Sequence, residues 1–168
     1  MLVKNFVPAY NSPMRLEQKV VQRFIDNKKT LAVAESCTGG LLTHLLTNVP
    51  GSSNFLKIGV VAYSNGSKIS ALKVPSSTIK RCGAVSEETA VAMAQAVRKI
   101  YQTDFGIGIT GIAGPSGGSR LKPVGLTYIA VSTVNETLCL RCLFRSSRTS
   151  IKSQAATQGL KLLSQFLT

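Results

Sequence analysis

Short apolar runs alternate with longer stretches whose apolar residues recur at helical spacing, and this alternation is the feature that most constrains the fold. Three runs are short and end in turn residues, as buried strands do: 30–34, 57–63 and 105–109. Three longer stretches place apolar side chains three or four positions apart, which indicates amphipathic helices: 16–25, 42–49 and 86–101. Strands that alternate with helices predict a sheet with parallel pairs that is covered by helices on both faces.

The last third of the chain predicts a β-hairpin and a final helix. Residues 124–134 and 137–144 read as paired strands that turn at Asn135-Glu136. An apolar stripe from Ile151 to Phe166 indicates the final helix. Together with the earlier alternation, this predicts a single α/β domain, a three-layer α/β/α sandwich with a mixed sheet.

The domain is expected to span residues 14–168. Residues 1–13 contain Pro8 and Pro13 together with Asn11 and Ser12, and they read as a flexible N-terminal tail. A further short helix is expected near 68–72.

Charge and composition narrow the classes of partner. The net charge of +13 attracts phosphorylated small molecules or polyanions. Nucleic-acid binding is the less expected outcome, because aromatics make up only 6% and no recognition motif is present. No apolar run reaches the roughly 18 residues that a membrane span needs, and the start does not read as a signal peptide, so we expect a cytoplasmic protein without a membrane partner.

The four cysteines do not indicate a disulfide scaffold or a metal site. Cys139 and Cys142 form a CxxC, but on a strand two positions three apart face opposite sides. The single histidine, His44, cannot complete a zinc ligand set. We therefore expect no metal.

The run Ala34-Glu35-Ser36-Cys37-Thr38-Gly39-Gly40 lies between a predicted strand and a predicted helix. Free backbone N–H groups and the positive end of a helix dipole at such a junction stabilise a phosphate or an oxyanion. Ser36 is a candidate nucleophile, and the alternative is a hydroxyl that caps the helix. Cys37 is a rival nucleophile, because a helix N-terminus lowers a thiol pKa. Glu35 is either a base or an acceptor for backbone N–H groups.

The segment Tyr63-Ser64-Asn65-Gly66-Ser67-Lys68 follows another predicted strand, so its side chains could converge on the sheet edge that holds Ser36. A serine nucleophile needs a base, and His44 flanks the apolar stripe of its helix and reads as structural. Lys68 is then the natural base if burial lowers its pKa toward neutrality. The alternative is that Lys68 is one of 20 surface cations.

A third segment, 106–119, is rich in glycine. It contains a formal GxGxxG at Gly106, Gly108 and Gly111, but the first glycines lie inside a strand and Val131 stands where a ribose-binding acid belongs. No Gly-Lys-Ser/Thr closes the segment as in a P-loop. What remains is a loop rich in N–H donors that suits an anion, with a purely structural loop as the alternative.

At these residues the chain resembles the CinA C-terminal domain family, from about Leu16 to Leu167. Four signatures occur in the family order: Ala-Glu-Ser-Cys-Thr-Gly-Gly at 34–40, Tyr-Ser-Asn-x-x-Lys at 63–68, Gly-Ala-Val-Ser at 83–86 and Thr-Gly-Ile-Ala-Gly-Pro-x-Gly-Gly-Ser at 110–119. The resemblance implies an α/β/α fold and an amidohydrolase that uses neither metal nor cofactor. Stand-alone family members include deamidases of nicotinamide mononucleotide in pyridine nucleotide salvage, so the implied substrate is that small molecule.

The resemblance also implies roles for individual residues. Ser36 attacks the carboxamide carbon, and Lys68 activates Ser36 and then protonates the departing ammonia. Tyr63 and Thr110 orient Lys68 or the substrate, and backbone N–H groups near Ser36 or Thr110-Gly111 hold the oxyanion. The implied substrate-binding residues lie in both glycine-rich segments and before the last helix: Thr38, Gly39, Gly40, Gly111, Gly114, Gly117, Gly118, Ser119 and Arg148. The chain departs from the family at Ser146-Ser147, where members often carry Gly-Asp before the arginine.

A second interpretation stays open. The domain could be a non-catalytic module that binds a nucleotide, or a competence-associated protein like other family members. The fold that the resemblance implies often leaves apolar helix faces for another subunit, so a homo-oligomer is an alternative to a monomer.

Overall fold

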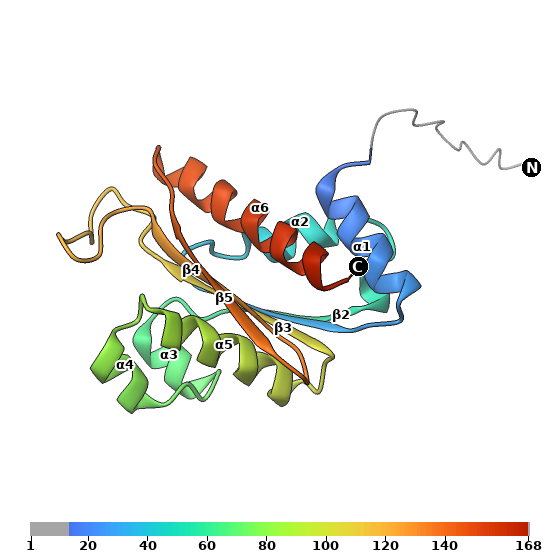
Figure 1. Cartoon of the computed structure of the whole chain (residues 1–168), viewed down its shortest axis with the longest axis horizontal. Helices are drawn as coiled ribbons and strands as arrows, with labels where there is room; N and C mark the ends of the chain where they lie inside the picture. The colour runs from blue at the N-terminus through green and yellow to red at the C-terminus, as the bar shows by residue number, and fades with distance from the viewer. Residues whose placement is uncertain (1–13, 168) are drawn as a thin grey trace, which may run out of the picture.

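The computed structural model describes residues 14–167, which form a five-stranded mixed sheet between two layers of helices (Figure 1). The strand order is β2-β1-β3-β4-β5, in which β1 pairs in parallel with β2 and β3 while β4 runs antiparallel to β3 and β5. The strands are β1 (Leu31–Glu35), β2 (Leu56–Val61), β3 (Phe105–Gly111), β4 (Leu126–Ser132) and β5 (Thr137–Leu143). The predicted three-layer sandwich with a mixed sheet is confirmed, whereas the predicted tail at 1–13 lies outside the described residues.

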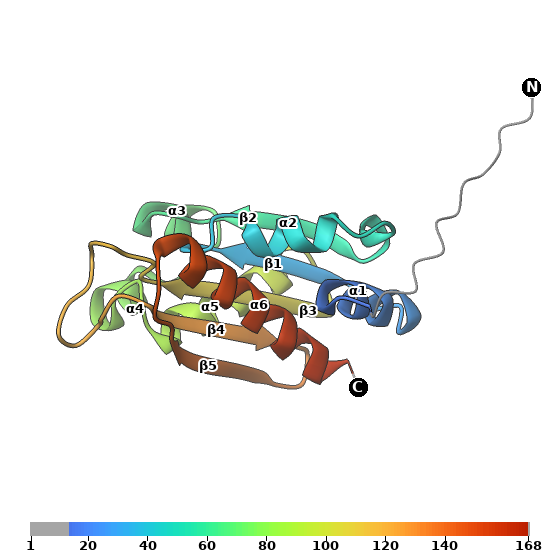
Figure 2. The ribbon, with the colours of Figure 1, turned by 90° about the horizontal axis from the view of Figure 1, so that it is seen from above.

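Helices cover both faces of the sheet (Figures 1 and 2). One layer holds α1 (Leu16–Asp26), α2 (Leu41–Thr47) and α6 (Arg148–Phe166). The other holds α3 (Asn65–Ser70), α4 (Ser76–Cys82) and α5 (Glu87–Ile100), and a short 3-10 helix, η1 (Ser52–Asn54), precedes β2. Because strand side chains alternate between faces, Val33 packs into the first layer while Ala32 and Ala34 pack into the second.

The edge strand β5 shows the same alternation at its two cysteines. Cys139 packs with Ala90, Ala94 and Ala130 on the α5 side, and Cys142 packs into the core on the opposite side. The prediction that these two thiols face opposite sides of a strand is confirmed.

Several element boundaries differ from the sequence-based expectation. β2 ends at Val61 and α3 begins at Asn65, because the Ser64 hydroxyl caps that helix by accepting the Ser67 N–H at 3.0 Å. Lys68 therefore lies inside α3 rather than at its start. The hairpin turns over four residues instead of two, closed by a hydrogen bond from the Thr133 N–H to the Glu136 carbonyl at 2.8 Å.

The centre of the sheet packs closely against α5. Gly106 and Gly108 of β3 face this helix, and a Cβ on Gly108 would lie 2.5 Å from the Ala90 carbonyl oxygen. A Cβ on Gly106 would collide with the Ala94 carbonyl. These glycines let the helix backbone approach the strand backbone, which explains why the formal GxGxxG lies inside a strand.

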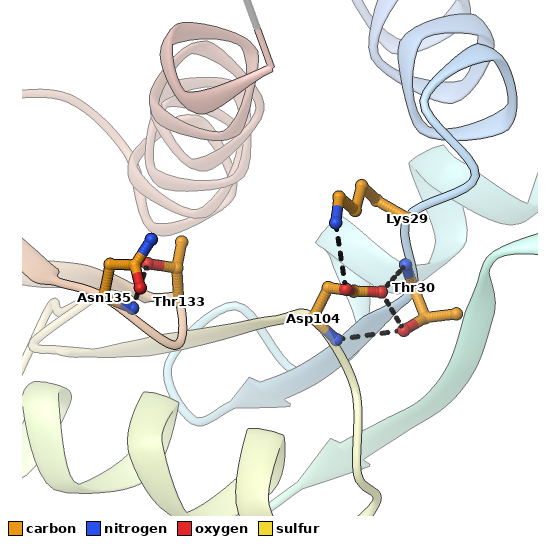
Figure 3. A network of polar contacts seen from close by, with 5 residues as sticks. All are labelled: Lys29, Thr30, Asp104, Thr133 and Asn135. Atoms are coloured by element: carbon orange, nitrogen blue, oxygen red, sulfur yellow. Dashed lines mark hydrogen bonds and ion pairs between the residues drawn. The ribbon is translucent and has the colours of Figure 1, made fainter.

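Asp104 joins the starts of β1 and β3 at the end of the sheet where both strands begin (Figure 3). Its carboxylate accepts the Thr30 N–H at 2.9 Å and the Thr30 hydroxyl at 2.8 Å, while its own N–H donates to the Thr30 hydroxyl at 2.9 Å. Lys29 Nζ lies 3.3 Å from the carboxylate. Burial raises the pKa of Asp104, but the bonds from Thr30 and Lys29 outweigh it and hold the pKa below its usual value.

The first and last described helices pack side by side. The Arg23 guanidinium donates to the Ser164 carbonyl at 2.8 Å and to the Ser164 hydroxyl at 2.9 Å. Beneath them Phe24 stacks on Phe55, with ring centroids 4.8 Å apart. Between residues 14 and 167, no helix has the length and apolar character of a membrane span.

Candidate active site

Ser36 directly follows β1 and is held against the central strand. Its N–H donates to the Ile109 carbonyl at 3.0 Å, and its own carbonyl accepts the Gly39 N–H at 3.1 Å. Gly39 and Gly40 have positive φ values of 64° and 93°, so the chain reverses tightly before α2 begins at Leu41. This turn presents the Ser36 hydroxyl at the carboxyl end of the strand.

The fully buried Glu35 carboxylate caps α2. It accepts the N–H groups of Gly40, Leu42 and Thr43 at 3.0, 3.2 and 2.8 Å, and the Thr43 hydroxyl at 2.8 Å. A carboxylate that satisfies the first amides of a helix is favoured by the helix dipole and is not free to act as a base. Of the two roles left open for Glu35, the structure favours the acceptor of backbone N–H groups.

Lys68 reaches Ser36 from α3. Its Nζ lies 2.8 Å from the Ser36 hydroxyl oxygen and 2.8 Å from the Ala62 carbonyl oxygen, and the side chain is only 1% exposed. Burial lowers the pKa of the Lys68 ammonium, because the charged form loses its hydration. The structure thus brings together the two residues that the sequence offered as nucleophile and base.

This pair has the geometry for proton transfer. A neutral amine at Lys68 keeps N–H groups for the Ala62 carbonyl and offers its lone pair to the Ser36 hydroxyl proton. The rival nucleophile is poorly suited, since burial raises the pKa of the Cys37 thiol to about 12. His44 lies on the exposed side of α2, where its ring contacts Asn48 at 3.0 Å.

Ser36 opens into a cavity of about 240 Å³. Most of its wall is the predicted anion loop after β3, with Tyr63 and Arg148 completing it. The lining residues are Ser36, Cys37, Tyr63, Gly111, Ile112, Ala113, Gly114, Ser116, Gly117 and Arg148. The cavity therefore collects Tyr63, Gly111, Gly114, Gly117 and Arg148 of the predicted site around the nucleophile.

Arg148 ties two walls of this cavity together. Its guanidinium donates to the Gly114 carbonyl at 2.6 Å and to the Tyr63 hydroxyl at 2.8 Å. Figure 2 shows the start of α6 beside the loop that follows β3, at the carboxyl ends of β1 and β3. Ser147 caps α6 through its hydroxyl, so the departure from Gly-Asp leaves Arg148 at the cavity.

Larger cavities of about 560 and 720 Å³ lie elsewhere. The first runs between α4 and α5, and the second lies around Arg81, Cys82 and Lys122. Neither contains a serine paired with a buried lysine. The reactive pair, rather than cavity size, identifies the site.

Thr110 and Thr38, two other predicted site residues, are buried. The Thr110 hydroxyl donates to the Ala84 carbonyl at 2.7 Å, and within residues 14–167 no hydrogen bond joins Thr110 or Tyr63 to Lys68. The Thr38 hydroxyl has no hydrogen-bond partner among the described residues. In this structure Thr110 connects β3 to the segment before α5, which is a structural contact.

Gly118 and Ser119 shape the loop rather than line the cavity. A Cβ on Gly118 would lie 2.9 Å from the Val124 side chain, and Ser119 exchanges hydrogen bonds with Lys122 at 2.8 and 3.0 Å.

Lys152 is a cation near the site that the motifs did not single out. It lies on α6, and its Nζ is 3.4 Å from the position that a Cβ on Gly39 would occupy. One signal could have found it: Lys152 lies at the start of the predicted final helix, only four residues after Arg148. Because α6 in the structure already begins at Arg148, the two residues belong to the same helix face.

Comparison with known proteins places this arrangement among relatives. Residues 14–167 match the model of a family described as the CinA C-terminal domain. A CinA-like protein of Syntrophus aciditrophicus is 47% identical over 153 residues, which cover 90% of this chain and 36% of the relative. A competence-damage inducible protein of Desulforudis audaxviator is 48% identical over 138 residues, 82% of this chain and 33% of the relative. The chain spans about a third of the length of these curated relatives.

Solved structures share the fold over almost their whole length. The competence/damage inducible protein of Agrobacterium tumefaciens superposes with a TM-score of 0.88 at 34% identity, covering 93% of this chain and 98% of that one. A protein of the competence-damaged superfamily from Enterobacter cloacae has the same TM-score at 32% identity, with coverage of 97% and 99%.

Proposed function

Because this chain belongs to the CinA C-terminal domain family, we propose that it is an amidohydrolase that converts nicotinamide mononucleotide and water to nicotinate mononucleotide and ammonia. The observation that carries the proposal is the 2.8 Å contact between Lys68 Nζ and the hydroxyl oxygen of Ser36, two buried residues of which Ser36 lines the cavity. The choice of substrate rests on the resemblance to family deamidases.

The first half of the reaction acylates the serine. Neutral Lys68 takes the Ser36 hydroxyl proton as the oxygen attacks the carboxamide carbon, giving a tetrahedral oxyanion. When the C–N bond breaks, the Lys68 ammonium returns this proton to the leaving nitrogen, which departs as ammonia. The N–H groups of Ser36, Gly39 and Gly40 are engaged within the fold, so the other N–H groups next to Ser36 and the N–H of Gly111 are the candidate donors to the oxyanion.

The second half releases the acid. Water attacks the ester carbon while Lys68 takes one of its protons, and the second oxyanion collapses by breaking the bond to the Ser36 oxygen. Lys68 then returns the proton to this oxygen, so the enzyme is regenerated and nicotinate mononucleotide leaves. Lys68 thus serves as base and acid in each half.

The charge distribution supports an anionic substrate. Residues 105–168 contain seven lysines and arginines but a single acid, Glu136. Arg148, from this stretch, lines the cavity itself. A cavity wall that carries an arginine and no acid attracts a phosphorylated substrate.

The non-catalytic interpretation is favoured by the names of the relatives, which refer to competence and damage rather than to hydrolysis. The buried Lys68 argues for catalysis. Burying a lysine costs desolvation free energy, and a module that only binds a ligand has no use for a desolvated amine beside a serine. The full-length relatives are about three times as long, so their roles can include more than this domain.

The test is ammonia release from nicotinamide mononucleotide by the purified chain and two variants. We expect Ser36→Ala to lower the rate at least about a thousandfold, because the nucleophile is lost. Ser153→Ala, a change at an exposed serine on α6, should retain the wild-type rate. No ammonia above background from the wild type, or full activity in Ser36→Ala, would overturn the proposal. Retention on DNA at roughly 0.2 M salt without ammonia release would favour the non-catalytic module.

A further inference from the structure

We infer that Lys152, together with Arg148, binds the phosphate group of the substrate and makes the site selective for a phosphorylated amide over the same amide without phosphate. The inference rests on the proposed function and deepens it. It assigns the phosphate contact to two side chains of α6 rather than to the glycine turn before α2.

The Lys152 ammonium lies next to the turn that holds the nucleophile. Its Nζ lies 3.4 Å from the position of a Cβ on Gly39, so the ammonium lies against the turn that presents Ser36. Gly39 itself is exposed, and its N–H belongs to the bond that closes the turn on the Ser36 carbonyl. An anion bound by Lys152 would therefore lie beside the nucleophile.

Lys152 lacks an anionic partner among the described residues. Among residues 14–167 it has no hydrogen bond and no ion pair, although its side chain is half-buried. A partly desolvated ammonium gains from a charge-assisted bond to phosphate oxygens. Asp and Glu are absent from 137–168, so α6 offers no acid of its own.

Arg148 supplies the second cation. It precedes Lys152 by four residues, so the two side chains share one face of the helix. The bonds to Gly114 and Tyr63 use two of the five guanidinium N–H donors and fix the side chain at the cavity, which leaves other donors for a ligand.

The glycine turn is a poor phosphate site in this structure. The Gly40 N–H donates to Glu35 and the Gly39 N–H donates to Ser36, so both amides are already engaged. The Glu35 carboxylate, buried beneath the turn, would repel a dianion that approached without a cation between them. Lys152, whose Nζ lies against this turn at Gly39, supplies that cation.

The test compares nicotinamide mononucleotide with nicotinamide riboside, which lacks the phosphate. We expect Lys152→Gln to lower the ratio of their kcat/KM values, nucleotide over riboside, by about 10- to 100-fold, the usual worth of one charged hydrogen bond. Lys152→Arg should restore most of the ratio. Lys161→Gln removes the same charge from the far part of α6 and should leave the ratio unchanged. An equal fall for both substrates, or an unchanged ratio in Lys152→Gln, would overturn the inference.

A binding measurement separates this inference from the proposed function. Inorganic phosphate is titrated calorimetrically into the wild type, Lys152→Gln and Lys161→Gln. We expect at least about tenfold weaker binding in Lys152→Gln alone. If neither amide is hydrolysed but this pattern holds, the anion site stands and the reaction is wrong. Equal phosphate binding by all three proteins would overturn the anion site.

Discussion

At the scale of single residues, the site depends on one buried amine. Lys68 Nζ contacts both the Ser36 hydroxyl and the Ala62 carbonyl, and the Ala62 N–H in turn donates to the Glu35 carbonyl at 2.8 Å. The base is thus fixed by backbone groups at the ends of β1 and β2. Its protonation state, rather than its position, is what changes with pH.

The pH dependence follows from the direction of this pKa shift. Burial lowers the pKa of Lys68, and only the neutral amine can accept the serine proton. We expect kcat/KM to fall about tenfold per pH unit below that pKa and to level off above it. In Lys68→Arg the guanidinium stays protonated, so kcat/KM should be at least about 100-fold lower and should no longer fall as the pH is lowered. Lys57→Gln, at an exposed lysine on β2, should keep the wild-type profile, and a wild-type rate that is flat with pH would contradict a lysine base.

Sequence patterns offered Ser36, Lys68 and the anion loop as candidates, because their residue types and their place after strands are visible in one dimension, and the family resemblance then implied their roles. They could not decide the role of Glu35, since a carboxylate next to a helix start can face the substrate or the helix. They did not indicate Lys152, because its contact is with Gly39, more than a hundred residues away in the chain.

At the scale of elements, the contact between β3 and α5 fixes the position of the strand end that carries part of the site. Gly106 and Gly108 let α5 lie directly on the strand whose end carries Gly111 and the anion loop. A side chain at either glycine has to displace backbone rather than a flexible side chain.

Gly108→Ala is expected to destabilise the protein by about 1–3 kcal/mol, because its methyl group would overlap the Ala90 carbonyl and push α5 from the sheet. The free energy of unfolding in urea measures this. Gly66→Ala is the matched control, since its new Cβ would lie 3.6 Å from the Ser64 hydroxyl oxygen, an ordinary contact. Equal stability of the Gly108→Ala protein and the wild type would show that the helix can move away at no cost.

Strong hydrophobic periodicity explains which elements the sequence predicts. The helix α5 carries five buried residues and a serine cap, and its range is close to the prediction. The helix α4 has no such stripe, since Ile79 is its one buried residue, and it was not predicted. The start of α3 is set by the Ser64 cap rather than by apolar spacing, which is why it begins at Asn65 instead of near 68.

At the scale of the whole molecule, positive charge dominates. With a net charge of +13, the basic side chains repel one another in the folded state. Each carboxylate that takes up a proton in acid raises the net positive charge and so adds to this repulsion. Among the seven acids, Asp104 has hydrogen bonds that join two neighbouring strands of the sheet. Its lowered pKa means that the folded state favours the charged form.

Asp104→Asn is expected to lower the free energy of unfolding at pH 7 by about 1–2 kcal/mol. This is the low end of the range for hydrogen bonds to a charged group, because the Asp104 side chain is partly exposed to water. A lowered folded-state pKa contributes stability above the ordinary carboxyl pKa, and this contribution is lost as pH falls through the lowered value. The difference from wild type should therefore shrink in acid. Asp26→Asn, at an exposed acid of α1 bonded to Gln22, should show no such trend. A difference that stays constant from pH 7 to about pH 3 would contradict this account.

The packing of α1 against α6 also determines how this molecule can be handled. Arg23 and Ser164 bring both ends of the described chain to the side of the sheet where β1 begins, while Ser36 lies at the side where β1 ends (Figure 1). An affinity tag, a surface tether or a fused domain attached at either end would therefore leave the cavity open to solution. Because both ends lie at this side, a circular permutant is expected to fold in which a linker joins residues 167 and 14 and new termini open in a loop remote from the cavity.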